Sequence, residues 1–218
     1  MIFERRRHGD VEVLTWNDGE NRYRADSVAE WHTTLDELEA TDGPLALVVT
    51  GTGKFFSNGL DLDWLGANPD EAGPMIDGVH RLFGRMLTLN LFTVGALNGH
   101  VFAGGAMLAC GFDVRVMRTG RGYWCLPEVD LGIPLTEPMF ATVAAQLPPA
   151  TLHEAIVTGR RYGAEEALAA GIVDHAVPEE RVVELAIELA QAMAAKDRSV
   201  IANHKRQMYG HVAEVCGA

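Results

Sequence analysis

Three short runs rich in apolar residues, the first of them continuous, constrain most strongly how this chain can fold. The first spans residues 45–49, between Gly43-Pro44 and Gly51, and the others span Phe92–Leu97 and residues 114–117. Strands that are apolar on both faces are typical of a parallel sheet with helices packed on each side. These runs therefore predict a buried sheet whose strands alternate with helices along the chain.

Helical spacing surrounds the predicted strands. Apolar residues recur every three or four positions from Val28 to Leu38, after an expected N-cap at Asp26 or Ser27. From residue 137 onward the pattern is almost wholly helical, with a small break at 171–174. Further predicted elements are a hairpin with strands at 2–7 and 11–16, a strand at 123–126, and helices at 61–65, 75–89 and 103–111.

This order of elements predicts an α/β fold with a helical C-terminal region. The 218 residues are 48% hydrophobic and 22% charged, and no linker or internal repeat divides them. We therefore expect a single domain, with a layered core over about residues 1–147 and helices over about 148–218. These helices offer more apolar surface than one sheet can cover, which favours a partner subunit.

Charge and targeting signals narrow the possible partners. The formal net charge of −12 disfavours nucleic acid and anionic membranes, because both require a basic face. Three separated cysteines, Cys110, Cys125 and Cys216, form no CxxC pair, which suits a reducing compartment. We find no apolar signal-peptide region, no membrane span of about 20 apolar residues and no C-terminal targeting tripeptide. The expected location is cytoplasmic.

The segment FFSNGLDLDWL, residues 55–65, has two interpretations. In the structural one, Asn58 and Gly59 form a surface turn before a helix that Asp61 caps. In the functional one, a loop that ends at a helix N-terminus offers free backbone N–H groups to an anion or a developing oxyanion.

The segment NGHVFAGGAMLA, residues 98–109, also has a structural and a functional interpretation. Its small residues at 103–106 allow close helix packing, which is the structural interpretation. In the functional interpretation, a strand runs into a helix N-terminus and glycine lets a ligand approach the backbone. Two such amides that converge on one carbonyl oxygen form an oxyanion hole, in which the loss of one donor costs about 2.7–4 kcal/mol.

The segment LPEVDLGIP, residues 126–134, places Glu128 after a strand and a proline, among largely apolar neighbours. Most glutamates are solvated surface residues. A partly desolvated carboxylate, however, has a raised pKa and can act as a general base near neutral pH. Asp130 and Glu137 remain alternatives for that role.

Other chemistries have no matching motif. The eight histidines form no HExxH and no paired spacing with cysteine, so we expect no metal site. GTGKFFSNG departs from the phosphate-binding loop pattern, and no G-x-S-x-G of a serine hydrolase is present.

In their order and spacing, the three segments, together with ALAAGIVDHAV near the C-terminus, resemble the enoyl-CoA hydratase/isomerase (crotonase) family. The resemblance implies a spiral of ββα turns before a helical C-terminal region, and a homotrimer or a dimer of trimers. It further implies that the Leu60 and Gly104 N–H groups hold the thioester oxygen of an acyl-CoA, with Glu128 as the acid/base.

The same resemblance implies a set of substrate contacts. These are Lys54, Asn58, Gly59, Asp61, Gly105 and Met107, with Lys205 or Arg206 as further candidates for the CoA phosphates. CoA belongs to the substrate, and no metal or redox cofactor is expected. Ala103, where many relatives have glycine, is interpreted as a neutral difference.

Met107 separates two reactions of the family. Hydratases carry a second glutamate at this position, because the addition of water needs two proton-handling groups. A 1,3-proton shift needs one carboxylate, so the sequence favours a Δ3,Δ2-enoyl-CoA isomerase, and DGENRYRADS and EVDLGIP resemble the plant type. The alternatives are a hydratase, another crotonase reaction such as hydrolysis or decarboxylation, and a non-catalytic acyl-CoA-binding subunit.

Overall fold

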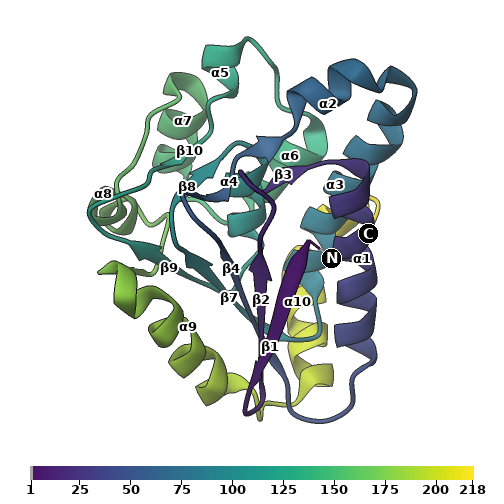
Figure 1. Cartoon of the computed structure of the whole chain (residues 1–218), viewed down its shortest axis with the longest axis vertical. Helices are drawn as coiled ribbons and strands as arrows, with labels where there is room; N and C mark the ends of the chain where they lie inside the picture. The colour runs from purple at the N-terminus through teal and green to yellow at the C-terminus, as the bar shows by residue number, and fades with distance from the viewer. Residues whose placement is uncertain (1) are drawn as a thin grey trace.

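The apolar runs form the centre of a six-stranded sheet in the order β1-β2-β4-β7-β9-β11. This arrangement is seen in a computed structural model that describes residues 2–218 (Figure 1). β1 and β2 form the predicted antiparallel hairpin, and the other neighbouring strands are parallel. The strands are β1 (Phe3–His8), β2 (Val11–Trp16), β4 (Ala46–Gly51), β7 (Phe92–Leu97), β9 (Val114–Arg118) and β11 (His175–Val177).

Shorter strands build a second layer and close each turn of a spiral. β5 (Phe55–Ser57), β8 (His100–Phe102) and β10 (Trp124–Cys125) form one sheet, and β3 (Arg22–Tyr23) pairs with β6 (Gly59–Leu60). After β4 the chain passes through β5 and β6 to α2 (Leu62–Ala67) and α3 (Pro69–Thr88). After β7 it passes through β8 to α4 (Gly104–Cys110), and after β9 through β10 to α5 (Glu128–Leu131). This repetition confirms the expected ββα spiral.

The main sheet is buried on both faces, which explains its runs rich in apolar residues. On β4, Ala46 and Val48 pack with Ala186 and Ala190 of α9 (Glu179–Met193), which covers one face. Leu47 belongs to the larger core on the other face, because successive side chains of a strand point to opposite sides. In Figure 1, α9 lies across one side of the sheet, and α1 (Ala25–Ala40) and α10 (Arg198–Val215) lie on the other.

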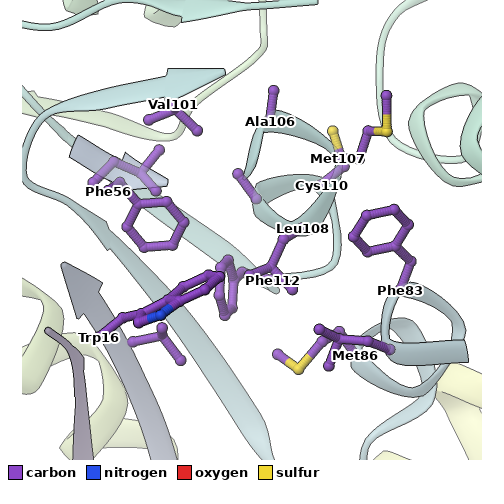
Figure 2. Packing of buried hydrophobic residues seen from close by; sticks show 14 of the residues in the cluster. Trp16, Phe56, Phe83, Met86, Val101, Ala106, Met107, Leu108, Cys110 and Phe112 are labelled. Atoms are coloured by element: carbon purple, nitrogen blue, oxygen red, sulfur yellow. The ribbon is translucent and has the colours of Figure 1, made fainter. Parts of the chain in front are cut away.

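The larger core fixes α4 against the second layer. Figure 2 shows Leu108 and Phe112 in one apolar cluster with Trp16 and Phe56. The rings of Phe56 and Phe112 meet edge to face, with centroids 6.2 Å apart. α4 also approaches β5 so closely that a Cβ on Gly105 would lie 2.6 Å from the Ser57 carbonyl oxygen. Gly105 is therefore required for packing, as the structural interpretation of this segment states.

Several element boundaries differ from the sequence predictions. α1 begins two or three residues earlier than expected, with Arg24 at the N-cap position, and the Ser27 hydroxyl accepts a hydrogen bond from the Arg24 N–H (2.9 Å). α3 begins at Pro69, because proline suits the first turn of a helix. β11 is a short edge strand just after the predicted break, so the C-terminal region is not wholly helical. The remaining helices are α6 (Glu137–Ala144), α7 (Pro149–Thr158) and α8 (Ala164–Ala169).

Within residues 2–218, no helix combines the length and the apolar character that crossing a bilayer requires.

Candidate active site

A cavity of about 450 Å³ lies where the three segments singled out in the sequence meet. Leu60 reaches it at the end of β6, Gly104 directly after β8, and Glu128 shortly after β10. Asn58 and Met107 also line it. The complete lining is Arg22, Asn58, Leu60, Leu62, Asp63, Phe102, Ala103, Gly104, Met107, Pro127, Glu128, Leu131, Ile133, Pro134 and Met139.

The first backbone donor is the N–H group of Leu60. The next N–H, that of Asp61, donates to the Tyr23 carbonyl oxygen on β3 (3.1 Å). Because successive N–H groups of a strand point to opposite edges, the Leu60 N–H points away from β3. Asp61 itself caps α2, since its carboxylate accepts the Trp64 N–H (3.0 Å), as the sequence predicted.

The second backbone donor is the N–H group of Gly104, the first residue of α4. No helical turn precedes it, so this N–H has no acceptor within the helix. Ala103, directly before it, has a φ of 51° and a ψ of −123°, a conformation that strongly favours glycine. The interpretation of Ala103 as a neutral difference is therefore wrong, because its backbone is strained at this site.

The two donor segments are in direct contact. A Cβ added to Gly59 would lie 2.8 Å from the Ala103 methyl group and 2.9 Å from the Gly104 nitrogen. Gly59 also has a φ of 76°, so glycine is required there for both space and conformation. Each donor thus follows a residue of positive φ, and these two residues pack on each other.

Glu128 begins α5 and is partly buried. Its Oε2 atom is inaccessible to solvent, and no donor among the described residues reaches it. Burial raises the pKa of the Glu128 carboxyl above its ordinary value, and a local backbone hydrogen bond opposes the rise. A carboxylate in this state accepts a proton more readily near neutral pH than a solvated one.

The other acidic candidates lie elsewhere. Asp130 and Glu137 are both exposed and are absent from the described lining of the cavity. The lining includes one further carboxylate, Asp63, whose side chain is fully exposed. Met107 is 1% exposed and presents an apolar side chain to the cavity. Glu128 is thus the one carboxylate in the described lining that has an oxygen inaccessible to solvent.

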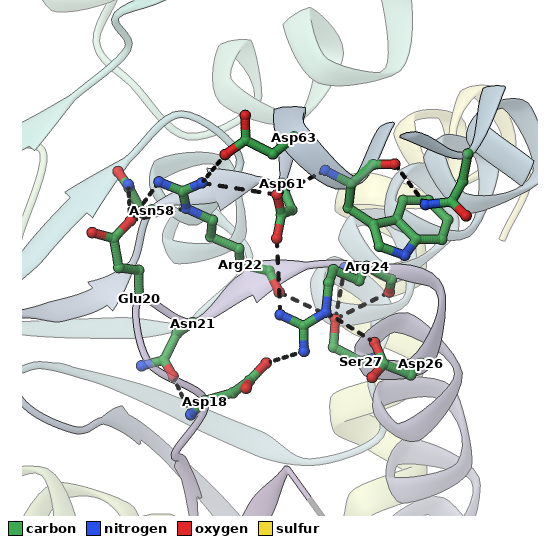
Figure 3. A network of polar contacts seen from close by, with 12 residues as sticks. Asp18, Glu20, Asn21, Arg22, Arg24, Asp26, Ser27, Asn58, Asp61 and Asp63 are labelled. Carbon is green, nitrogen blue, oxygen red and sulfur yellow. Dashed lines mark hydrogen bonds and ion pairs between the residues drawn. The ribbon is translucent and has the colours of Figure 1, made fainter. Parts of the chain in front are cut away.

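Charged residues gather beside the cavity (Figure 3), and among them the sequence analysis did not single out Glu20, Arg22 or Asp63. Arg22 lines the cavity and forms an ion pair with Glu20 (2.5 Å), with Asp61 and Asp63 at 3.8 and 3.9 Å. The Asn58 side chain donates to the same Glu20 carboxylate (2.8 Å). Arg22 lies on β3 and pairs with Gly59 on β6. These two strands have only two residues each, so no periodic pattern in the sequence could predict their pairing.

Four predicted substrate contacts, Lys54, Gly59, Asp61 and Gly105, are not part of the described cavity lining. Gly105 packs against Ser57 of β5, as described above. Gly59 and Asp61 have the structural roles given above, and Lys54 is exposed with its ammonium 5.1 Å from the centre of the Phe55 ring. Arg206 is exposed on α10, outside this lining.

The candidacy of Lys205 for the CoA phosphates is wrong. Its side chain is buried, and its ammonium donates to Asp113 Oδ2 (2.6 Å) and to the Leu91 carbonyl oxygen (2.7 Å). Helical spacing on α10 could not reveal an internal partner 92 residues earlier in the chain.

Among residues 2–218, no three histidine, cysteine, aspartate or glutamate side chains gather in a way that could hold a metal ion.

Similarity to known proteins agrees with this geometry. The sequence model of the enoyl-CoA hydratase/isomerase family matches residues 7–215. The peroxisomal enoyl-CoA delta isomerase 2 of Arabidopsis thaliana is 34% identical over 225 residues, which cover 97% of this chain and 92% of that protein. The carnitinyl-CoA dehydratase of Escherichia coli K12 is 38% identical over 151 residues, which cover 67% of this chain and 56% of that protein.

A solved structure extends the similarity to three dimensions. The human mitochondrial delta3-delta2-enoyl-CoA isomerase superposes with a TM-score of 0.91 at 27% identity. The superposition covers 99% of this chain and 86% of the human one.

Proposed function

Because the chain belongs to the enoyl-CoA hydratase/isomerase family, we propose that it is a Δ3,Δ2-enoyl-CoA isomerase that uses Glu128 as its single acid/base. The observation that carries the proposal is one carboxylate with an oxygen inaccessible to solvent, facing an apolar cavity that also contains Leu60 and Gly104. The similarity to the Arabidopsis and human isomerases supports the choice of reaction.

The backbone donors stabilise the charge that develops during the reaction. The thioester oxygen of the substrate lies between the N–H groups of Leu60 and Gly104. As a proton leaves C2, negative charge moves onto this oxygen and a dienolate forms. Both donors are held by the backbone before substrate arrives, so little reorganisation is needed at the moment of reaction.

Glu128 moves the proton. Its carboxylate removes a proton from C2 of the 3-enoyl thioester, and the resulting carboxylic acid returns that proton to C4. The double bond moves from C3–C4 to C2–C3, and Glu128 ends as the carboxylate with which it began. No oxidation state changes, so the reaction needs no redox cofactor. We propose that the two backbone N–H groups stabilise the thioester oxygen in place of a metal ion.

Met107 distinguishes isomerisation from hydration. Hydratases of the family have a second glutamate at this position, whereas the buried thioether of Met107 offers no proton acceptor and no means to orient water. An apolar wall also keeps water from the dienolate.

The surroundings of the site complete the proposal. Arg22 and Asn58 lie on the polar side of the cavity, where the CoA moiety enters, and Lys54 contacts a phosphate group further out. The assembly is a homotrimer or a dimer of trimers, and the location is cytoplasmic.

Product analysis tests the reaction. We expect the purified protein to convert 3-hexenoyl-CoA into 2-hexenoyl-CoA, with little 3-hydroxyhexanoyl-CoA, as followed by mass spectrometry. Hydration of 2-hexenoyl-CoA at a comparable rate would favour the hydratase alternative. Binding of hexanoyl-CoA without turnover of either enoyl substrate would favour the non-catalytic alternative.

A further inference from the structure

The part of the chain that carries Glu128 is poorly covered by the rest of the protein. Residues 127–136, which we call the Glu128 segment, lie between β10 and α6. Within this segment, residues 129–134 are all exposed. A segment with little buried surface opens easily, so other contacts are needed to hold its carboxylate in one place.

Most hydrogen bonds of the Glu128 segment are local. The Ile133 N–H donates to the Glu128 carbonyl oxygen (3.0 Å), and two further N–H groups donate to the Pro127 carbonyl oxygen. These bonds close one compact turn, so Ile133 and Glu128 move together. The turn also touches Gly159 at the end of α7, where an added Cβ would lie 2.7 Å from Asp130 Oδ2.

One hydrogen bond joins the Glu128 segment to an element distant in the sequence. His80 lies on α3 and is 9% exposed, and its Nε2 atom is 3.0 Å from Thr136 Oγ1. Among the described residues, no other hydrogen bond links this segment to a helix or strand outside α5 and α6. Leu135 packs partly against the core, but such a contact has no direction. The contact between His80 and Thr136 is therefore the directional anchor of the segment.

The Thr136 hydroxyl group serves this contact and α6 at the same time. Its oxygen accepts the Met139 N–H (3.4 Å) at the N-terminus of α6. Burial lowers the pKa of the His80 imidazole, although Asp77, one turn earlier on α3, opposes this effect. The neutral ring can accept the hydroxyl hydrogen at Nε2, which leaves the hydroxyl oxygen free for Met139.

We propose that His80 is a positioning residue, which fixes Thr136 and thereby holds the turn that presents Glu128 to the substrate. The inference rests on the proposed function, in which Glu128 moves the proton. Only two residues separate Thr136 from Ile133, and one of them is Pro134, whose φ is restricted. Because the Ile133 N–H is bonded to Glu128, a shift of Thr136 is passed to Glu128. A displacement of about 1 Å at a reacting group can cost about 10²-fold in rate.

Kinetics of two variants and a control test this role. His80→Leu removes the hydrogen bond at similar volume, whereas His80→Gln keeps an amide that can bond to Thr136. His32→Leu is the matched control. His32 on α1 is also a partly buried histidine that contacts α3, with its Nε2 atom 2.9 Å from the Gly78 carbonyl oxygen, and it is absent from the described cavity lining.

We expect kcat for 3-hexenoyl-CoA to fall at least about tenfold in His80→Leu, while the Kd of hexanoyl-CoA stays within about twofold of the wild type. His80→Gln should restore most of the kcat. His32→Leu should keep the wild-type kcat even where it lowers stability. A wild-type kcat in His80→Leu overturns the inference, as does an equal loss in His80→Gln or in His32→Leu.

The partner of His80 gives a second route, so the inference remains testable if His80→Leu does not fold. Thr136→Val breaks the same contact and should lose kcat, whereas Thr136→Ser retains the hydroxyl and should keep it. In the double variant His80→Leu with Thr136→Val, the loss should be smaller than the product of the two single losses, because both changes break one contact. Single losses that multiply would show that the two residues act independently, and the inference would be wrong.

Hydrogen exchange separates failure of this inference from failure of the proposed function. The Ile133 amide should exchange at least about fivefold faster in His80→Leu than in the wild type, and at an unchanged rate in His32→Leu. A protein that isomerises 3-hexenoyl-CoA, with wild-type kcat and exchange in His80→Leu, keeps its function and loses the positioning role. A protein that moves no double bond, but whose Ile133 amide exchanges faster in His80→Leu, keeps the anchor and overturns the reaction.

Discussion

Lys205 under α10 and Glu128 at the cavity are two ionisable residues that lose contact with solvent, and their surroundings differ. Lys205 is 5% exposed, and its ammonium has two acceptors, Asp113 and the Leu91 carbonyl oxygen. The Oε2 atom of Glu128 is also inaccessible to solvent, but no donor among residues 2–218 reaches it. One buried charge is thus paired, and the other is left without a partner.

This difference separates structural from chemical use of a charge. Asp113 holds the ammonium in place and also accepts hydrogen bonds from the Thr93 backbone N–H and hydroxyl, which joins β7, β9 and α10. A donor on Glu128 Oε2 would instead stabilise the carboxylate and lower its basicity. The fold therefore leaves one buried oxygen of Glu128 without a hydrogen-bond donor, which keeps this carboxylate basic.

The largest expected effect comes from removing the unpaired charge. Glu128→Gln keeps the shape of the side chain but cannot take a proton, so we expect kcat to fall about 10²–10⁴-fold. Affinity for hexanoyl-CoA should change little, as measured by calorimetry. Asp130→Asn is the control and should keep near wild-type kcat. A Glu128→Gln variant that retains more than about a tenth of the activity would assign the proton transfer to another group.

Removing the paired charge should affect stability. Lys205→Met leaves Asp113 without its cation, and we expect the free energy of unfolding to fall by about 3 kcal/mol. Lys196→Met, at an exposed lysine, should change it by less than about 0.5 kcal/mol. The double variant Lys205→Met with Asp113→Asn should recover part of the loss in urea unfolding. Equal free energies of unfolding for Lys205→Met and Lys196→Met would contradict a structural role for the ion pair between Lys205 and Asp113.

The pH dependence of stability should distinguish Glu128 from an ordinary carboxyl. Its pKa is raised in the folded protein, so the folded state holds this proton more tightly than the unfolded chain does. This contribution to stability is fully present below the unfolded pKa and is lost as pH rises through the folded pKa. Glu128→Gln should therefore gain stability relative to the wild type as pH rises above the unfolded pKa of about 4.3 and through the raised folded pKa. Parallel pH profiles of the two proteins in urea unfolding would refute this.

The central strands of the sheet and the three segments of the site could be predicted from the sequence, whereas the contacts between distant residues could not. Runs rich in apolar residues predicted β4, β7 and β9, because burial on both faces leaves a local pattern. The two- and three-residue strands β3, β6 and β8 are too short for a period to appear, and they set where Arg22, Leu60 and Ala103 lie. The partner of Lys205 is equally non-local, so no pattern within α10 could reveal it.

The smallest expected effect concerns Ala103, whose backbone at the cavity is strained. It extends the comparison between the cavity and the rest of the fold from side-chain charge to backbone conformation. Its φ of 51° costs about 1–3 kcal/mol for a residue with a Cβ, and glycine would remove this cost at a smaller loss of unfolded-state entropy. We expect Ala103→Gly to raise the free energy of unfolding by about 1 kcal/mol.

The matched control for Ala103 lies on the helix that follows it. Ala109 is buried in the regular part of α4, so Ala109→Gly should lower the free energy of unfolding by at least about 1 kcal/mol. The same chemical change thus has opposite signs six positions apart, and urea unfolding of both variants measures them. If both variants lose stability equally, the backbone at Ala103 is not strained, and its methyl contact with Gly59 matters more than its conformation.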